Sequence, residues 1–106
     1  MRQEHNKLIR DHIPEIIRQT GRECEVKMMS QSEYHQALLD KLIEEAQEAA
    51  EAKPDDLLEE LADIYEVIDA ILNNAEIDKR LVVAKQKQKR QEKGGFTNKT
   101  RLLWTE

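Results

Sequence analysis

The chain is 106 residues long, carries a net charge of −5 and contains 37% charged but only 4% aromatic residues. This length fits a single domain, residues 1–106, and the scarcity of aromatic residues argues against a large apolar cavity lined by rings. Charged residues set among aliphatic ones are instead typical of amphipathic helices, so we expect an all-α protein.

The first predicted element is a short helix. It begins after Asp11, whose side chain can cap a helix N-terminus, has Pro14 in its first turn and ends before Gly21. In the following residues 23–28, charged and apolar side chains alternate, which is the pattern of a half-buried strand. Since a lone strand needs a partner, we pair it with residues 101–105 in a minor two-stranded ribbon.

Three longer helices are predicted in the remainder of the chain. They span residues 30–52, 55–74 and 76–93. A capping box of Ser30 and Glu33 opens the first helix, and Pro54 separates it from the second. Because the connection at Pro54 is short, the first two helices should be antiparallel neighbours, and we expect an antiparallel helical bundle.

Charge is distributed unevenly along the chain. Residues 31–78 carry fifteen acids against two bases, whereas residues 79–106 carry nine bases against two acids. The two regions could simply neutralise each other across packed helices, or they could supply an acidic metal site and a basic clamp for phosphate. Both interpretations are compatible with one small domain.

Four acidic residues of the two central helices form the predicted metal site. Glu45 and Glu48 lie on one face of the first long helix, and Glu60 and Asp63 lie one turn apart on the second. Glu45 occupies a position where the helical pattern calls for an apolar residue, so its side chain should point partly inward. Buried carboxylates need a neutralising cation, and oxygen ligands alone favour Mg²⁺, with Mn²⁺ as the alternative.

A solvated acidic helix face is the competing interpretation of these residues. Lys partners at i+4, which are usual on such a face, are missing, because Glu44, Glu45 and Glu48 are followed at that spacing by Glu48, Ala49 and Ala52. A hypothesis from another class of protein is a non-enzymatic helical adaptor, whose acidic surface would bind a basic partner protein without any metal.

The acidic motifs and both ends of the chain carry a resemblance to a known family. The matching segments are residues 7–17 (KLIRDHIPEII), residues 44–48 (EEAQE), residues 60–63 (ELAD) and residues 94–96 (GGF). Together they resemble the all-α NTP pyrophosphatase superfamily, which includes MazG, the dimeric dUTPases and phosphoribosyl-ATP pyrophosphohydrolase. The terminal segments are most similar to its small MazG-like, phosphoribosyl-ATP pyrophosphohydrolase-like house-cleaning branch. The resemblance spans nearly the whole chain.

This resemblance implies a bundle of MazG-like type and Mg²⁺-dependent cleavage of an NTP or dNTP to the monophosphate and pyrophosphate. House-cleaning of noncanonical nucleotides is the implied role, and phosphoribosyl-ATP is the alternative substrate. The implied metal ligands are Glu45, Glu48, Glu60 and Asp63. Glu44 and Glu45 are the implied catalytic residues, with Glu44 placed to orient water.

Five basic residues are candidates for binding the polyphosphate of the substrate. They are Lys7, Arg10, Lys41, Lys89 and Arg90. Lys41 lies one turn before Glu45 on the same helix face. Each of the five alone is more often a solvated surface residue, and the basic run near the C-terminus would also suit nucleic acid, which we consider the weaker interpretation.

The compartment and the assembly follow from composition. A single cysteine, Cys24, cannot form an internal disulfide, and no apolar run approaches the roughly 18 to 20 residues of a membrane span. We therefore expect a cytoplasmic protein with no membrane partner. Because a thin aliphatic core often needs another subunit to complete it, we also expect a homodimer or homotetramer.

Overall fold

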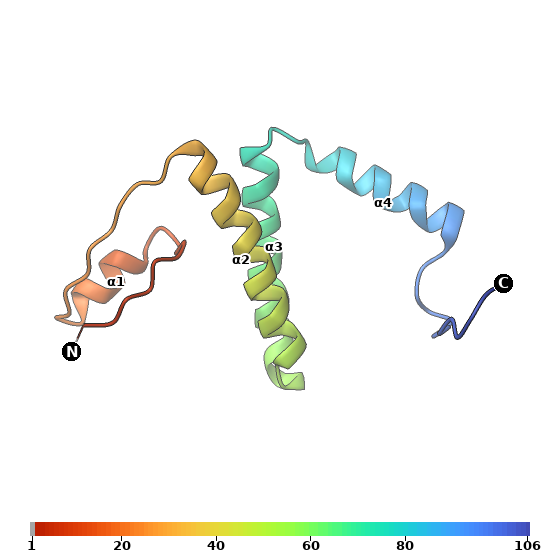
Figure 1. The fold of residues 1–106 in the computed structure, drawn as a ribbon, viewed down its shortest axis with the longest axis horizontal. Coiled ribbons are helices and arrows are strands. Elements are labelled where there is room, and N and C mark those ends of the chain that lie inside the picture. The colour runs from red at the N-terminus through yellow and green to blue at the C-terminus, as the bar shows by residue number, and fades with distance from the viewer. Residues whose placement is uncertain (1) are drawn as a thin grey trace.

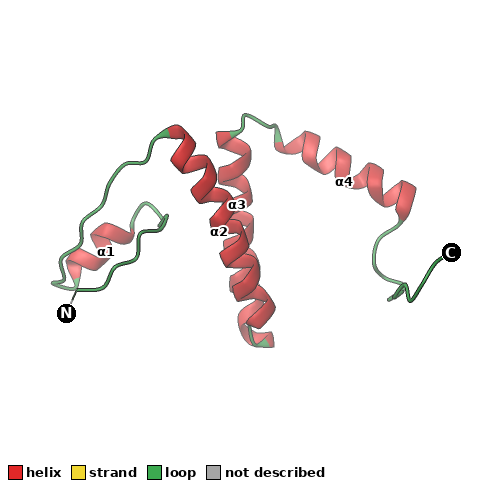
Figure 2. Cartoon of the chain, viewed as in Figure 1, coloured by secondary structure: helices red, strands yellow, loops and turns green. Residues whose placement is uncertain are grey.

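The computed structural model describes residues 2–106, so Met1 of the predicted domain lies outside the described residues. Its elements are α1 (Ile13–Gln19), α2 (Gln31–Glu51), the 3₁₀ turn η1 (Pro54–Asp56), α3 (Leu57–Asn74) and α4 (Lys79–Lys93). Figure 2 shows helices joined by loops, and residues 2–106 contain no strand. The all-α prediction is therefore confirmed.

The hairpin of α2 and α3 holds most of the packing in the chain. At its start, Ser30 Oγ accepts from the Glu33 N–H at 3.2 Å, and Glu33 Oε1 accepts from the Ser30 N–H at 3.0 Å. This is the predicted capping box, and the Ser30 N–H lowers the pKa of the Glu33 carboxyl. Leu38 of α2 and Val67 of α3 are the buried apolar residues of the hairpin.

The two outer helices begin later than the sequence predicts. The N-cap of α1 is His12 rather than Asp11, because the Ile13 N–H donates to the Arg10 carbonyl at 3.1 Å and closes a turn that includes Asp11. Helix α4 begins at Lys79 rather than at residue 76, since Glu76 has a left-handed backbone with φ 56°.

The predicted ribbon of residues 23–28 and 101–105 is wrong. In Figure 1 the chain just before α2 lies on the α1 side of the hairpin, whereas the C-terminus lies beyond α4 on the other side. The two segments are thus too far apart to exchange hydrogen bonds, and neither forms a strand. Alternating side chains predict a strand only where a partner is within reach, and Met28 and Leu103 stay exposed here.

The molecule is extended for its length. Its Cα radius of gyration is 18.3 Å and its extents are 58 × 34 × 26 Å, whereas a compact chain of this length has a radius of about 13 Å. Helices α1 and α4 lie on opposite sides of the hairpin and α4 runs away from it (Figure 1). None of the helices in residues 2–106 is long and apolar enough to cross a membrane.

Candidate metal centre

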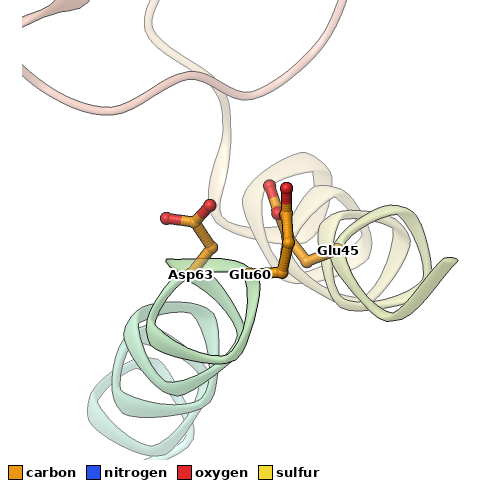
Figure 3. A group of neighbouring side chains, drawn as sticks. All are labelled: Glu45, Glu60 and Asp63. Atoms are coloured by element: carbon orange, nitrogen blue, oxygen red, sulfur yellow. The ribbon is translucent and has the colours of Figure 1, made fainter. Parts of the chain in front are cut away.

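Three carboxylates meet where α2 faces the first turns of α3. Glu45 of α2 and Glu60 and Asp63 of α3 each offer one carboxylate oxygen, and these three atoms lie within 4.8 Å of one another. Figure 3 shows the three side chains pointing the same way from the two helices. Glu45 is buried, with 7% of its surface exposed, which confirms that its side chain points inward from an otherwise apolar position.

Two oxygens of this group lack hydrogen-bond partners. Glu45 Oε2 and Glu60 Oε2 are buried, and neither accepts a hydrogen bond from any group in residues 2–106. A buried acceptor left without a donor costs about 1 to 3 kcal/mol, and more when it is charged. A divalent cation held by the three carboxylates would neutralise their charge, and hard oxygen donors without His or Cys suit Mg²⁺ or Mn²⁺. These residues therefore fit the predicted metal.

Glu48, the fourth predicted ligand, lies at the edge of the group. It is exposed on α2, one turn after Glu45, and is not among the three carboxylates whose oxygens converge. Burial raises the pKa of the Glu45 carboxyl, and the neighbouring Glu48 carboxylate raises it further. Glu48 is thus close enough to act on Glu45 electrostatically, and its part in binding metal stays a prediction.

Basic residues surround the carboxylates. Lys41 Nζ lies 3.4 Å from Glu45 Oε1 and 3.5 Å from Glu44 Oε2, so it bridges the two adjacent acids. Lys41 partly opposes the rise in the pKa of Glu45. From the N-terminal segment, Lys7 Nζ lies 3.4 Å from Glu44 Oε1, which gives Glu44 a cation on each oxygen.

Arg10 makes the shortest of the ion pairs at this site. Its Nη2 donates to Asp63 Oδ1 at 2.7 Å, joining the loop before α1 to α3 across 53 positions of sequence. The sequence predicted Arg10 as a phosphate ligand and did not predict this partner. The only sequence signal for the pairing was opposite charge, which does not select one carboxylate among the fifteen acids of residues 31–78.

The five predicted phosphate ligands fall into two groups. Lys7, Arg10 and Lys41 lie at the carboxylates, as just described. Lys89 and Arg90 lie in the last turns of α4, which extends away from the hairpin, so a single chain does not bring them to this site (Figure 1).

A small cavity of about 140 Å³ adjoins the site at Glu44. Its lining residues come from the N-terminal segment, the loop before α2 and α2 itself: Asn6, Lys7, Leu8, Met29, Ala37, Asp40, Lys41 and Glu44. Sequence reasoning did not single out Asn6, Met29 or Asp40, because nothing in their spacing indicates that two distant segments face each other. The cavity offers both cationic and anionic groups within reach of the carboxylates.

The raised pKa of Glu45 leads to a prediction for the metal-free protein. The folded-state pKa of Glu45 lies above its ordinary value of 4.5. Protonated Glu45 is therefore tolerated in the folded protein at pH values below 4.5, and its contribution makes the folded state more stable there than at higher pH. This contribution is lost as pH rises through the raised pKa. We expect Glu45→Gln to raise the Tm in EDTA by a few degrees at pH 7 and to change it little at pH 4, as measured by thermal melts monitored by circular dichroism.

The same variant has the opposite effect when metal is present, because it removes a ligand. In millimolar Mg²⁺, Glu45→Gln should melt below the wild-type protein. A variant that melts like wild type at pH 7 in EDTA would contradict a destabilising charge at this position.

The site thus combines three convergent carboxylates with neighbouring lysine and arginine side chains, and two of its oxygens accept no hydrogen bond within residues 2–106. This is the arrangement of charges that suits a divalent cation together with an anionic ligand. Comparison with models of protein families, with curated proteins and with solved structures finds no match.

Proposed function

We propose that the chain is a Mg²⁺-dependent pyrophosphohydrolase that cleaves an NTP or dNTP to the monophosphate and pyrophosphate. The observation that carries the proposal is the pair of buried oxygens on Glu45 and Glu60, next to Asp63, that accept no hydrogen bond from the described residues 2–106. Resemblance of the acidic motifs and chain ends to the all-α NTP pyrophosphatase superfamily supplies the reaction class. A MazG-like bundle and a cytoplasmic location belong to the same proposal.

Different residues of the site would bind the metal and orient the attacking water. Glu45, Glu60 and Asp63 would hold the metal, and Glu48 at the rim would complete the set. Mg²⁺ bound there would neutralise phosphate oxygens and lower the pKa of water. Glu44, whose carboxylate oxygens pair with Lys7 and Lys41, would orient the attacking water.

The cations beside the site would bind the polyphosphate. Arg10 and Lys7 are paired with carboxylates through ion pairs whose side chains are about half exposed. Exposed pairs of this kind contribute little stability, typically about 0 to 1 kcal/mol, so an arriving polyphosphate can compete for the cations. Arginine is well suited to this because its guanidinium matches phosphate oxygens in a bidentate manner.

The cavity beside Glu44 has no aromatic side chain on which a nucleotide base could stack. Its lining contains no aromatic residue, while Tyr65, Phe96 and Trp104 are exposed elsewhere. Asn6 and Asp40 are lining residues without another assigned role, and their polar groups could contact a base or a sugar. This arrangement fits an enzyme that removes several noncanonical nucleotides, and phosphoribosyl-ATP is kept as the alternative substrate.

The products and the bond that breaks provide the direct test. We expect hydrolysis in ¹⁸O-labelled water to place the label in the nucleoside monophosphate, because attack at the α-phosphorus releases unlabelled pyrophosphate. Mass spectrometry of both products, with the pyrophosphate analysed before any further hydrolysis, gives the answer. No Walker loop of the form GxxxxGK[ST] is present in the sequence to hold the β- and γ-phosphates for γ-transfer.

Other outcomes of this experiment have defined meanings. Label confined to pyrophosphate would move the attack to the β-phosphorus, and release of a diphosphate would overturn the reaction class. A protein without hydrolase activity that binds a basic partner equally well in EDTA and in Mg²⁺ would instead favour the adaptor hypothesis.

A further inference from the structure

Each of the two helices at the metal centre has one carboxylate that is paired with a cation of the chain itself. On α2, Lys41 Nζ lies 3.4 Å from Glu45 Oε1. On α3, Asp63 Oδ1 accepts a hydrogen bond of 2.7 Å from Arg10 Nη2. Glu45 and Asp63 both belong to the three carboxylates whose oxygens converge. Two positive charges of the chain therefore already face the group that could hold a divalent cation.

The two cations differ in how firmly they are held. Lys41 lies on the same helix as Glu45, its side chain is only 18% exposed, and it also pairs with Glu44 at 3.5 Å. Arg10 lies in the loop before α1, and its side chain is 57% exposed. The exposed side chain of a loop residue can change rotamer within nanoseconds and without disturbing a helix. Arg10 is therefore the cation that can leave the site while α2 and α3 stay in place.

Charge sets Arg10 against a metal ion at Asp63. A guanidinium is not deprotonated in proteins, so Arg10 cannot escape repulsion by becoming neutral. A divalent cation bound by Asp63 would share that carboxylate with Arg10, and like charges close together repel each other. The ion pair offers little resistance, because the Asp63 side chain is itself 40% exposed and pairs between exposed groups are weak. Asp63 can thus exchange one positive partner for another.

We propose that Arg10 is a built-in counter-cation of Asp63 that a divalent metal ion displaces. Arg10 acts on the metal through Asp63 and is therefore a positioning residue of the site. The guanidinium that leaves Asp63 becomes available to phosphate oxygens, so Arg10 binds phosphate only after Asp63 has taken up the metal. The inference rests on the metal site of the proposed function, but it holds whichever nucleotide is cleaved and whichever bond breaks.

The affinity of the full chain for Mn²⁺ tests this exchange in the absence of any substrate. Electron paramagnetic resonance detects free Mn²⁺ and so gives the Kd. Arg10→Gln removes the competing charge and should lower this Kd by about three- to fivefold, the size expected for one exposed ion pair. Arg10→Lys keeps the charge and should bind Mn²⁺ as the wild-type protein does. The titrations are compared at one pH and one ionic strength, because salt screens exposed charges.

Lys7→Gln is the matched control. Lys7 belongs to the same segment before α1 and also forms an exposed ion pair, but its partner Glu44 is not one of the three convergent carboxylates. This variant loses the same charge from the same region, and its Kd should change less than that of Arg10→Gln. Equal gains in affinity for the two variants would show a general effect of the lost positive charge and would overturn the inference.

The remaining outcomes separate the inference from the proposed function. If Arg10→Gln binds Mn²⁺ only as tightly as wild type, or more weakly, then Arg10 does not compete with the metal. The inference then fails while the metal site stands. If the wild-type protein binds no Mn²⁺, both the inference and the metal site of the proposed function fail. Circular dichroism checks the fold of each variant, and since Arg10 and Lys7 are exposed, both variants should keep the helicity of the wild-type protein.

Discussion

Replacing Asp63 with Asn is expected to lower kcat/KM for nucleoside triphosphate hydrolysis by about 10² to 10³-fold, as for loss of a group that stabilises charge in the transition state. Asp63 is one of the three convergent carboxylates, and the amide removes the charge while keeping the shape. Glu60→Gln should have a similar effect. Steady-state kinetics of pyrophosphate release at fixed Mg²⁺ would measure the loss.

Helicity should survive these changes, since the side-chain bond that Asp63 makes is to the exposed Arg10. Glu66→Gln, one turn further along α3 and exposed, is the control that should retain activity. The variant Glu48→Gln tests whether exposed Glu48 is a metal ligand. We expect this substitution to abolish hydrolysis. Full activity in both Glu48→Gln and Asp63→Asn would remove the basis for the site assignment.

Millimolar Mg²⁺ is expected to raise the Tm by on the order of 10 °C. A ligand present at a hundred times its Kd stabilises the native state by about 2.7 kcal/mol, and each kcal/mol moves the Tm of a domain of this size by about 4 to 8 °C. Part of the gain is relief of repulsion, because Glu45 lies beside Glu48 in the metal-free protein. Differential scanning fluorimetry over a Mg²⁺ titration would record the shift.

Two comparisons show whether the shift comes from the site. Asp63→Asn should lose most of it, whereas Glu66→Gln should keep it. Melting curves that coincide in EDTA and in millimolar Mg²⁺ would argue that the three carboxylates do not bind the ion. This measurement does not depend on whether the protein hydrolyses a nucleotide.

The hairpin and its inward carboxylate could be predicted from sequence because their signals are local. A capping box at Ser30 and a proline at position 54 set the ends of α2 within one or two residues. Glu45 was recognised because it occupies a position in an apolar ridge, and the structure buries it. In both cases the informative residues lie within a few turns of each other.

The features that sequence reasoning missed depend on distant partners or on backbone conformation. The local sequence pattern of residues 23–28 is the same as that of a real strand. These residues form a loop because no second strand lies beside them. The pairing of Arg10 with Asp63 joins segments 53 positions apart. The late start of α4 follows from the left-handed backbone of Glu76, a conformation that Glu seldom adopts and that its identity does not signal.

The shortness of the turn at Pro54–Asp56 has a consequence for how the chain folds. Glu45 and Glu60 are only fifteen positions apart, and the contacts between helices are concentrated in the hairpin that joins them. Local contacts of this kind form early because little chain entropy is lost in closing the loop. If this hairpin forms early, we expect the mutual repulsion of its carboxylates to slow folding, and a cation that neutralises them, such as Mg²⁺, to speed it.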